Sequence, residues 1–380
     1  MSEIGETPEN VVSVSKPEKQ KSKKEVITAA DKIILVPIPL ITDKSNSPSD
    51  DKRDFVSLSP YWHLDESGEP KHVDTVINPE VESYQDPEKL KTVKNAIYIC
   101  SLAVNATEDA SQKEKYRDYA VSTIRTWFID EETRMTPSLE YAQIKPGEKS
   151  GNFWGIIDGA GLVQVVEGIS NLRDAGLIDE ETLDGAKKWL DQYLNWLLTS
   201  EKGVGKKGAE SEKERGGERE MPNNHGTFYG TQVAYIADFL GKEEIVQDAI
   251  QSTKERIKTQ ITPEGEMPEE TKRGDMSLDY QVFNLFALSE MAVIAKKHGV
   301  DLWNYETDDK RGIGKAFEYV SGQLESKDKK SFRYNRTGEL YYSFRAASQA
   351  YGMEKYWDLP QRIYNDPLSD EVSAELFRKD

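Results

Sequence analysis

From Asp86 onward, apolar residues recur at helical spacing, and this pattern constrains the fold more than any other feature of the chain. Leu90, Val93, Ile97 and Cys100 follow one another at intervals of three or four residues, so they line one face of a helix. The same period recurs in residues 155–172, 181–198, 227–240, 243–258, 278–297 and 312–324. Strand-like alternation is nearly absent. The pattern therefore predicts an all-α fold of antiparallel helix pairs, either wound into a ring or gathered in a bundle.

The N-terminal part of the chain differs in composition from the helical part. Residues 1–25 combine Glu, Lys, Ser and Pro with almost no large apolar side chains, so burial cannot offset the entropy of ordering them. We expect a disordered polar tail over residues 1–25 and a folded domain over residues 26–380. Residues 43–79 are irregular and carry four prolines, which predicts a long structured loop region.

The charge and the cysteine count limit the kinds of partner and site. A formal net charge of −18 argues against sequence-independent binding of nucleic acid or of an anionic membrane surface. An acidic protein can still bind a polyanion where Arg, Lys and amide donors gather in one cleft. The apolar run at residues 33–41 is too short to span a bilayer. Cys100 is the only cysteine, which excludes an intramolecular disulfide and a cysteine-rich metal site.

Polar residues crowd into two segments, residues 221–229 and residues 265–280, and each segment precedes an apolar-periodic helix. The first contains the run Asn-Asn-His and the second contains an arginine and a tyrosine seven residues apart. Ordinary structural roles are open to each of these residues: the asparagines suit helix caps, the histidine suits a buried hydrogen bond, and the tyrosine suits aromatic packing. Their combination and spacing favour a functional site.

These motifs carry a resemblance to a known family. Asn223, Asn224 and His225, followed by an aromatic pair, resemble the Asn-Asn-His signature of the alginate lyase superfamily. Arg273, followed by glycine, and Tyr280 resemble the second motif of that superfamily. The order and the spacing of the two motifs agree with the family pattern.

The resemblance extends over most of the chain, from about residue 43 to about residue 295. Residues 54–62, 78–80 and 126–143 are similar to further family blocks and occur in the same order. The chain departs from the family at residues 151–158, which lack an expected arginine, and at Met267, where glutamine is common. The resemblance implies that residues 26–380 form a catalytic domain with an incomplete α/α toroid, a barrel of paired antiparallel helices.

The family activity is β-elimination of a 1,4-linked uronic-acid polymer, either alginate or polymannuronate, or glucuronan, which leaves unsaturated uronate ends. The C5 proton of a uronate is barely acidic while its carboxylate is ionised, so that charge must be neutralised as the carbanion forms. By resemblance, Asn224 and Arg273 lie at the carboxylate.

A base must then remove the C5 proton and an acid must protonate O4, and Tyr280 and His225 are the candidates. In D-mannuronate and D-glucuronate the C5 hydrogen and O4 lie on one ring face, so an ionised Tyr280 can serve both steps. In L-guluronate they lie on opposite faces, which would require His225 as base and Tyr280 as acid. The sequence leaves this choice open.

Further residues are candidates for binding the sugar chain. Tyr61, Trp62 and Trp154 suit stacking walls, Gln143 suits a hydroxyl or carboxylate partner, and Asn223 belongs to the binding motif. No metal-ligand spacing appears, so we expect neither a metal nor a cofactor. The expected partner is an acidic polysaccharide, and the oligomeric state is not predicted. Family members are extracellular or periplasmic, although no signal peptide is recognisable in this sequence.

Two other functions compete with the lyase. A glycoside hydrolase on an α/α toroid would need two carboxylates around the scissile bond, for which Glu269, Glu270 and Asp158 are available. A non-catalytic uronan-binding protein on the same fold is the other alternative. Only the lyase produces an unsaturated uronate that absorbs in the ultraviolet.

Overall fold

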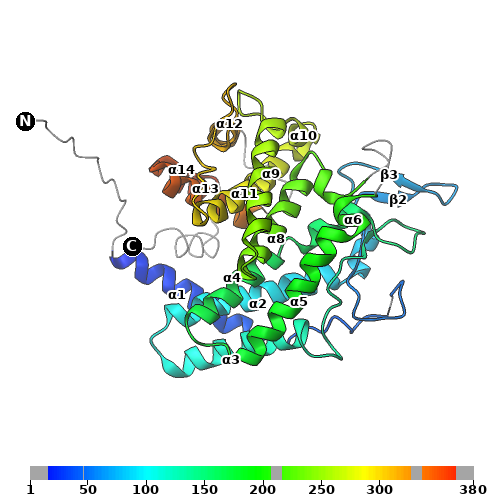
Figure 1. The fold of residues 1–380 in the computed structure, drawn as a ribbon, viewed down its shortest axis with the longest axis vertical. Coiled ribbons are helices and arrows are strands. Elements are labelled where there is room, and N and C mark those ends of the chain that lie inside the picture. Colours follow the sequence, from blue (N-terminus) through cyan, green and yellow to red (C-terminus); the bar gives the residue numbers. More distant parts are fainter. Residues whose placement is uncertain (1–15, 46, 207–215, 327–335, 365–380) are drawn as a thin grey trace, which may run out of the picture.

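The computed structural model describes residues 16–45, 47–206, 216–326 and 336–364, and these are predominantly helical (Figure 1). The helices are α1 (Lys16–Ile33), α2 (Asp86–Ala106), α3 (Ala110–Phe128), α4 (Leu162–Asp174), α5 (Glu180–Thr199), α6 (Glu201–Val204), α8 (Asn224–Phe239), α9 (Glu243–Gln260), α10 (Pro268–Thr271), α11 (Ser277–Lys297), α12 (Ile313–Ser326), α13 (Thr337–Tyr351) and α14 (Glu354–Ile363). The 3-10 helices are η1 (Pro79–Ser83), η2 (Phe153–Gly159), η3 (Glu218–Glu220) and η4 (Gly274–Met276).

Local sequence signals set several of the helix ends. Helix α3 begins after Asp109 because that side chain accepts a hydrogen bond from the backbone N–H of Gln112. Asp179 caps α5 in the same way through Thr182. Helix α13 ends where Gly352 adopts a left-handed conformation with φ 64°, which glycine tolerates without a steric penalty.

Neighbouring helices pack in pairs that follow the order of the chain. Helix α2 packs on α1, α3 and α4, α8 packs on α9 and α11, and α11 packs on α12 and α13. These pairs form an incomplete α/α toroid, which confirms the predicted all-α ring. A hydrophobic core that includes side chains from Val26 to Leu359 holds the pairs together, and Cys100 is fully buried within it.

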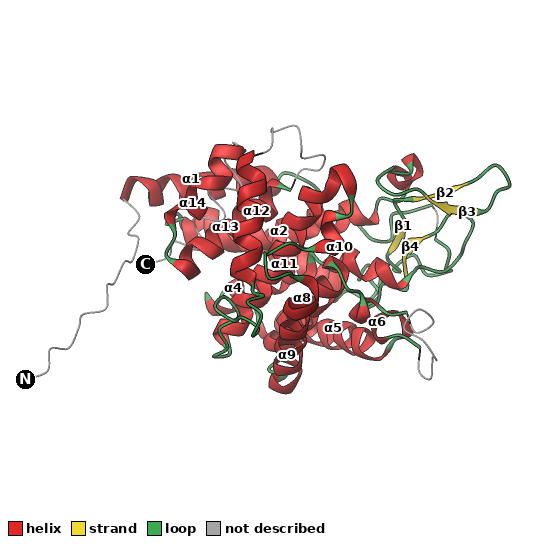
Figure 2. Cartoon of the chain, turned by 90° about the horizontal axis from the view of Figure 1, so that it is seen from above, coloured by secondary structure: helices red, strands yellow, loops and turns green. Residues whose placement is uncertain are grey.

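Four short strands gather at one end of the helical body (Figure 2). Strand β1 (Val56–Leu58) pairs in parallel with β4 (Tyr141–Ile144), and β2 (Trp62–Leu64) pairs antiparallel with β3 (Pro70–His72). Three of them lie in the predicted loop region, residues 43–79. Strands of three or four residues are too short for an alternating pattern to stand out in a sequence.

The structure corrects two predictions about the elements and adds two helices. Helix α1 begins at Lys16, so residues 16–25 are helical rather than part of a disordered tail. Val26 and Ala30 are fully buried in the core, which anchors the helix and allows it to extend toward the N-terminus. Residues 153–159 form η2, so α4 begins later than the apolar period suggested. Helices α13 and α14 were not predicted.

Parts of the predicted segments lie outside the described residues, namely residues 1–15 of the tail and residues 365–380 of the folded domain. Among the helices that the structure describes, none combines the length and the apolar content needed to cross a bilayer.

One buried carboxyl group in the helical body should make stability depend on pH. Glu290 on α11 has no exposed surface, and Gln164 donates a 2.8 Å hydrogen bond to its Oε1. Its Oε2 has no hydrogen-bond partner among the described atoms. Burial, followed by the charge of Glu167, raises the pKa of Glu290 well above its usual range. The folded state therefore holds a proton that the unfolded chain releases near pH 4.

We expect Glu290→Gln to stabilise the protein under alkaline conditions. The stability that the bound proton contributes is complete below the unfolded pKa and is lost as the pH rises through the folded pKa. Glutamine keeps the shape of the protonated side chain without needing a proton. Tm should therefore rise at about pH 8, by about 2–4 °C for each kcal/mol of unfolding free energy that is recovered. At about pH 5, Tm should change little. Thermal unfolding at both pH values tests this, with the exposed Glu255→Gln as control. An equal loss of Tm at both pH values would contradict it.

Candidate active site

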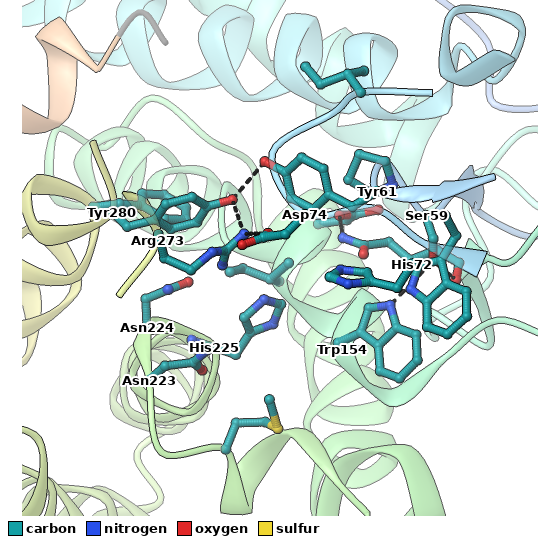
Figure 3. A pocket seen from close by; sticks show the side chains of 18 of the residues that line it. Ser59, Tyr61, His72, Asp74, Trp154, Asn223, Asn224, His225, Arg273 and Tyr280 are labelled. Carbon is teal, nitrogen blue, oxygen red and sulfur yellow. Dashed lines mark hydrogen bonds and ion pairs between the residues drawn. The ribbon is translucent and has the colours of Figure 1, made fainter. Parts of the chain in front are cut away.

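A cavity of about 920 Å³ opens where the short strands meet the N-terminal ends of α8 and α11. All nine predicted site residues line it, and the close-up labels seven of them around a common space, all except Trp62 and Gln143 (Figure 3). They are Tyr61, Trp62, Gln143, Trp154, Asn223, Asn224, His225, Arg273 and Tyr280. Residues from four distant segments of the chain therefore converge on this cavity.

The N-terminus of α8 positions the Asn-Asn-His motif. The Asn223 side chain caps the helix by accepting a hydrogen bond from the backbone N–H of His225 at 3.2 Å. Asn224 is fully buried, and Glu270 binds it twice. The backbone N–H of Asn224 donates to Oε1 of Glu270 at 2.7 Å, and its Nδ2 donates to Oε2 at 2.8 Å.

The His225 imidazole is held by a buried carboxylate. Its Nδ1 lies 2.8 Å from Oε1 of Glu218, which has no exposed surface. Burial by itself lowers the pKa of His225, but the charge and the hydrogen bond of Glu218, together with Glu270 and Asp158, raise it above the usual value. The pair therefore favours a protonated imidazole whose Nδ1 donates to Glu218.

A second cluster is centred on the Tyr280 hydroxyl, at the start of α11. This hydroxyl lies 2.7 Å from the Tyr61 hydroxyl and accepts a 3.2 Å hydrogen bond from Nη2 of Arg273. The guanidinium also lies 4.0 Å from the centroid of the Tyr280 ring. The same Nη2 donates to Oδ1 of Asp74 at 2.8 Å (Figure 3). A positive charge therefore lies directly beside the phenol oxygen.

The end of the cavity formed by the strands carries an aromatic wall. The rings of Trp62 and Trp154 stack with centroids 6.1 Å apart and planes 6° from parallel. The ammonium group of Lys145 lies 4.4 Å from the Trp62 ring centroid. Trp154 is brought here by the close packing of η2 on β4, since a Cβ at Gly155 would meet the backbone oxygen of Ala142 at 2.5 Å. Flat rings in such a position suit stacking on sugar rings.

Gln143 adopts a strained backbone conformation in the cavity wall. Its φ of 49° is unusual for a residue other than glycine, and strain of this kind persists only where surrounding contacts fix it. Ser57 Oγ accepts from its backbone N–H at 2.7 Å, and Ser59 Oγ donates to its carbonyl oxygen at 2.6 Å. Its Nε2 donates to Asp158 at 2.8 Å. The amide is thereby oriented with its nitrogen committed to Asp158.

The cavity is locally rich in cations despite the net charge of −18. Lys272, Arg273 and Arg336 all line it. Such a cluster of donors suits a polyanion. Within the part of the chain that the structure describes, there is no group of three or more His, Cys, Asp or Glu side chains arranged to hold a metal ion.

Several residues of the site were not predicted from the sequence. His72 packs against the Trp62 ring at 5.5 Å, and Asp74 binds Arg273. Glu218 lies only seven residues before His225, but its segment is so charged that no single carboxylate stands out. Glu270 was considered only as a possible hydrolase carboxylate. Glu269 and Glu270 do not line the cavity, unlike Asp158, so no carboxylate pair faces it from these three positions.

Comparisons with known proteins show which family the chain resembles. A family model described as alginate lyase matches residues 40–332. An alginate lyase from Bacteroides ovatus, solved as a crystal structure, superposes with a TM-score of 0.82 and 26% sequence identity, over 95% of this chain and 94% of that chain. The comparison with curated proteins finds no match.

More distant structures share the fold. Alginate lyase A1-III from Sphingomonas species A1 superposes with a TM-score of 0.57 and 15% identity, over 99% of this chain and 100% of that chain. A histidine-to-alanine form of alginate lyase A1-III, complexed with a tetrasaccharide, gives a TM-score of 0.59 and 16% identity over 99% of both chains. Since the family model spans well over half of the sequence, this chain belongs to the alginate lyase family and is a polysaccharide lyase.

Proposed function

We propose that this lyase cleaves alginate at D-mannuronate units by syn β-elimination, with Tyr280 as both base and acid. The observation that carries the proposal is the placement of the Tyr280 hydroxyl, within hydrogen-bonding distance of both Arg273 and Tyr61 at the cavity wall. The choice of alginate is supported by the family and by the related structures, which are alginate lyases.

Charge stabilisation comes from the groups around the substrate carboxylate. As the C5 proton leaves, negative charge spreads onto that carboxylate, so fixed donors lower the barrier. We assign this role to the Arg273 guanidinium and the Asn224 amide, both of which line the cavity. Nη2 of Arg273 donates to both Asp74 and the Tyr280 hydroxyl, and Nε is buried, so Nη1 is the nitrogen left to bind a carboxylate.

Tyr280 would carry the proton between two atoms of the sugar. The adjacent guanidinium attracts a phenolate, and the Tyr61 hydroxyl can donate a hydrogen bond to it. The phenolate removes the C5 proton, the electron pair forms the C4–C5 double bond, and the C4–O4 bond breaks. The phenol then returns that proton to O4, which lies on the same ring face in mannuronate.

His225 fits a supporting role better than that of a base. Glu218 favours its protonated form, which has no lone pair with which to accept a proton. A protonated imidazole can instead donate through Nε2 to the substrate and share its charge. The elimination of L-guluronate, which calls for a base on the opposite face, should therefore be slower.

Neighbouring sugars would be held along the aromatic wall. Trp62 and Trp154 provide stacking surfaces, with Tyr61 and the helix cap Asn223 nearer to the reacting unit. The Nε2 of Gln143 is bound to Asp158, so its Oε1 is the end suited to accept from a sugar hydroxyl rather than to bind a carboxylate. An extracellular or periplasmic location belongs to this proposal, since the family resemblance supports it.

A panel of polyuronates tests the proposal and its alternatives. We expect purified protein to raise the ultraviolet absorbance of polymannuronate solutions faster than that of polyguluronate or glucuronan. Chain shortening without an absorbance increase would instead show a hydrolase. Binding of the polymers without shortening or absorbance would show a non-catalytic uronan-binding protein.

A further inference from the structure

The Asn224 amide lies between a buried carboxyl group and the cavity in an orientation that does not suit a carboxylate ligand. Its Nδ2 points away from the cavity and donates to Oε2 of Glu270. Its Oδ1 is buried and has no hydrogen-bond partner among the described residues. A buried acceptor without a hydrogen bond destabilises the folded protein. An amide oxygen would also repel the substrate carboxylate that Asn224 is assigned to bind.

A proton on Glu270 removes both difficulties once a substrate carboxylate is bound. The two ends of an asparagine amide are nearly equal in size, so a half-turn of the amide exchanges them within the same space. If Oε2 of Glu270 carries a proton, it can donate to Oδ1 of the reversed amide. Oε1 of Glu270 still accepts from the backbone N–H of Asn224, so the first contact is kept. The reversed amide turns Nδ2, in place of Oδ1, away from Glu270 and toward the cavity that Asn224 lines.

We propose that Glu270, when protonated, is a positioning residue that turns the Asn224 amide so that its Nδ2 donates to the substrate carboxylate. When Glu270 is ionised, it holds the amide in the orientation of this structure, with Nδ2 donating to Oε2 of Glu270, which does not suit a carboxylate ligand. This inference rests on the proposed function, since it concerns how the same cavity binds a uronate.

The surroundings of Glu270 allow both states near neutral pH. Glu270 lies on α10, and it is almost fully buried. Burial raises its pKa to about 7, although its two bonds to Asn224 and the charges of His225 on α8 and Arg273 beside η4 oppose this shift. Tyr280, at the start of α11, lies beside Arg273. The arriving substrate carboxylate adds negative charge and therefore favours uptake of a proton by Glu270.

The pH dependence of kcat/KM separates this role from a purely structural one. Glutamine at position 270 can accept from the Asn224 backbone through its oxygen and donate to Oδ1 through Nε2, so it mimics the protonated acid at every pH. In the wild-type enzyme, the fraction of protonated Glu270 falls about tenfold per pH unit above about pH 7. The kcat/KM of the wild-type enzyme should therefore decline above this pH. We expect Glu270→Gln to remove the decline in kcat/KM, whereas Glu270→Ala should lower kcat/KM at all pH values.

The outcomes are distinct. Glu264→Gln, at an exposed position shortly before α10, is the control and should keep the wild-type profile. A Glu270→Gln enzyme whose profile matches that of the wild type, or whose activity is as low as that of Glu270→Ala, overturns the inference. A wild-type enzyme that forms no unsaturated product from any polyuronate overturns the proposed function instead.

A binding measurement tests the same idea without turnover. Tyr280→Phe should bind mannuronate oligomers with uptake of a proton at about pH 7.5, seen as a dependence of the calorimetric enthalpy on the buffer. Adding Glu270→Gln to this variant should reduce the uptake. Binding of the oligomers to Tyr280→Phe with no proton uptake overturns the inference.

Discussion

Tyr280→Phe is expected to abolish turnover almost fully while the enzyme still binds its polymer. General acid–base groups contribute about 10²- to 10⁴-fold each, and a residue that serves both steps should fall at the upper end of this range or beyond. Phenylalanine keeps the ring beside Arg273 but removes the oxygen that takes the C5 proton. The rate of ultraviolet absorbance increase on polymannuronate measures the loss, and calorimetry with oligomers measures the binding.

Tyr61→Phe is the matched control for this substitution. It removes the hydroxyl that lies 2.7 Å from the Tyr280 oxygen but leaves the base in place. We expect a smaller loss, about that of one hydrogen bond to a charged group, which is about 1.5–3 kcal/mol or 10- to 150-fold in rate. If Tyr280→Phe kept more than about a tenth of wild-type turnover, the assigned mechanism would be wrong.

Arg273→Ala should produce the second-largest loss because the guanidinium serves two purposes. It lies 3.2 Å from the Tyr280 oxygen, where it stabilises a phenolate, and it is assigned to the substrate carboxylate. Removing one preorganised donor of a developing charge costs about 10²- to 10³-fold in kcat. Steady-state kinetics on polymannuronate should show a fall in kcat together with a rise in KM, since both chemistry and binding lose a partner.

Two further variants test the role of Arg273 separately. Arg273→Lys keeps the charge but not the planar fork, so it should recover only part of the lost activity. Asp74→Asn removes the carboxylate that now binds Nη2, so it should lower KM if Arg273 binds the substrate. An Arg273→Ala enzyme with unchanged kcat would contradict the role of Arg273 in the chemical step.

The fold and the centre of the site were predictable because their signals are local. Long amphipathic helices are recognisable from the helical spacing of their apolar residues. Polar residues at helix starts indicate where side chains face a cavity. His225 and Tyr280 each lie in the first turn of a long helix, so their motifs are compact in the sequence. The five predicted residues of these two motifs, Asn223, Asn224, His225, Arg273 and Tyr280, all line the cavity.

The missed parts depend on contacts between distant segments. Asp74 and Arg273 are 199 positions apart in the chain, and no local sequence pattern predicts their contact. Glu270 binds Asn224 from 46 positions away, and its burial decides its chemistry. Residues 16–25 were predicted to be disordered because composition does not show that Val26 is anchored in the core.

The masses of the limit products from polymannuronate test the central claim most directly. Elimination leaves an unsaturated sugar at each new non-reducing end, so every product that carries such an end should be lighter by one water than the corresponding saturated oligomer. Mass spectrometry after exhaustive digestion measures this difference without relying on absorbance. The account predicts unsaturated oligomers with wild-type enzyme and uncut polymer with Tyr280→Phe, whereas saturated oligomers from the wild-type enzyme would contradict it.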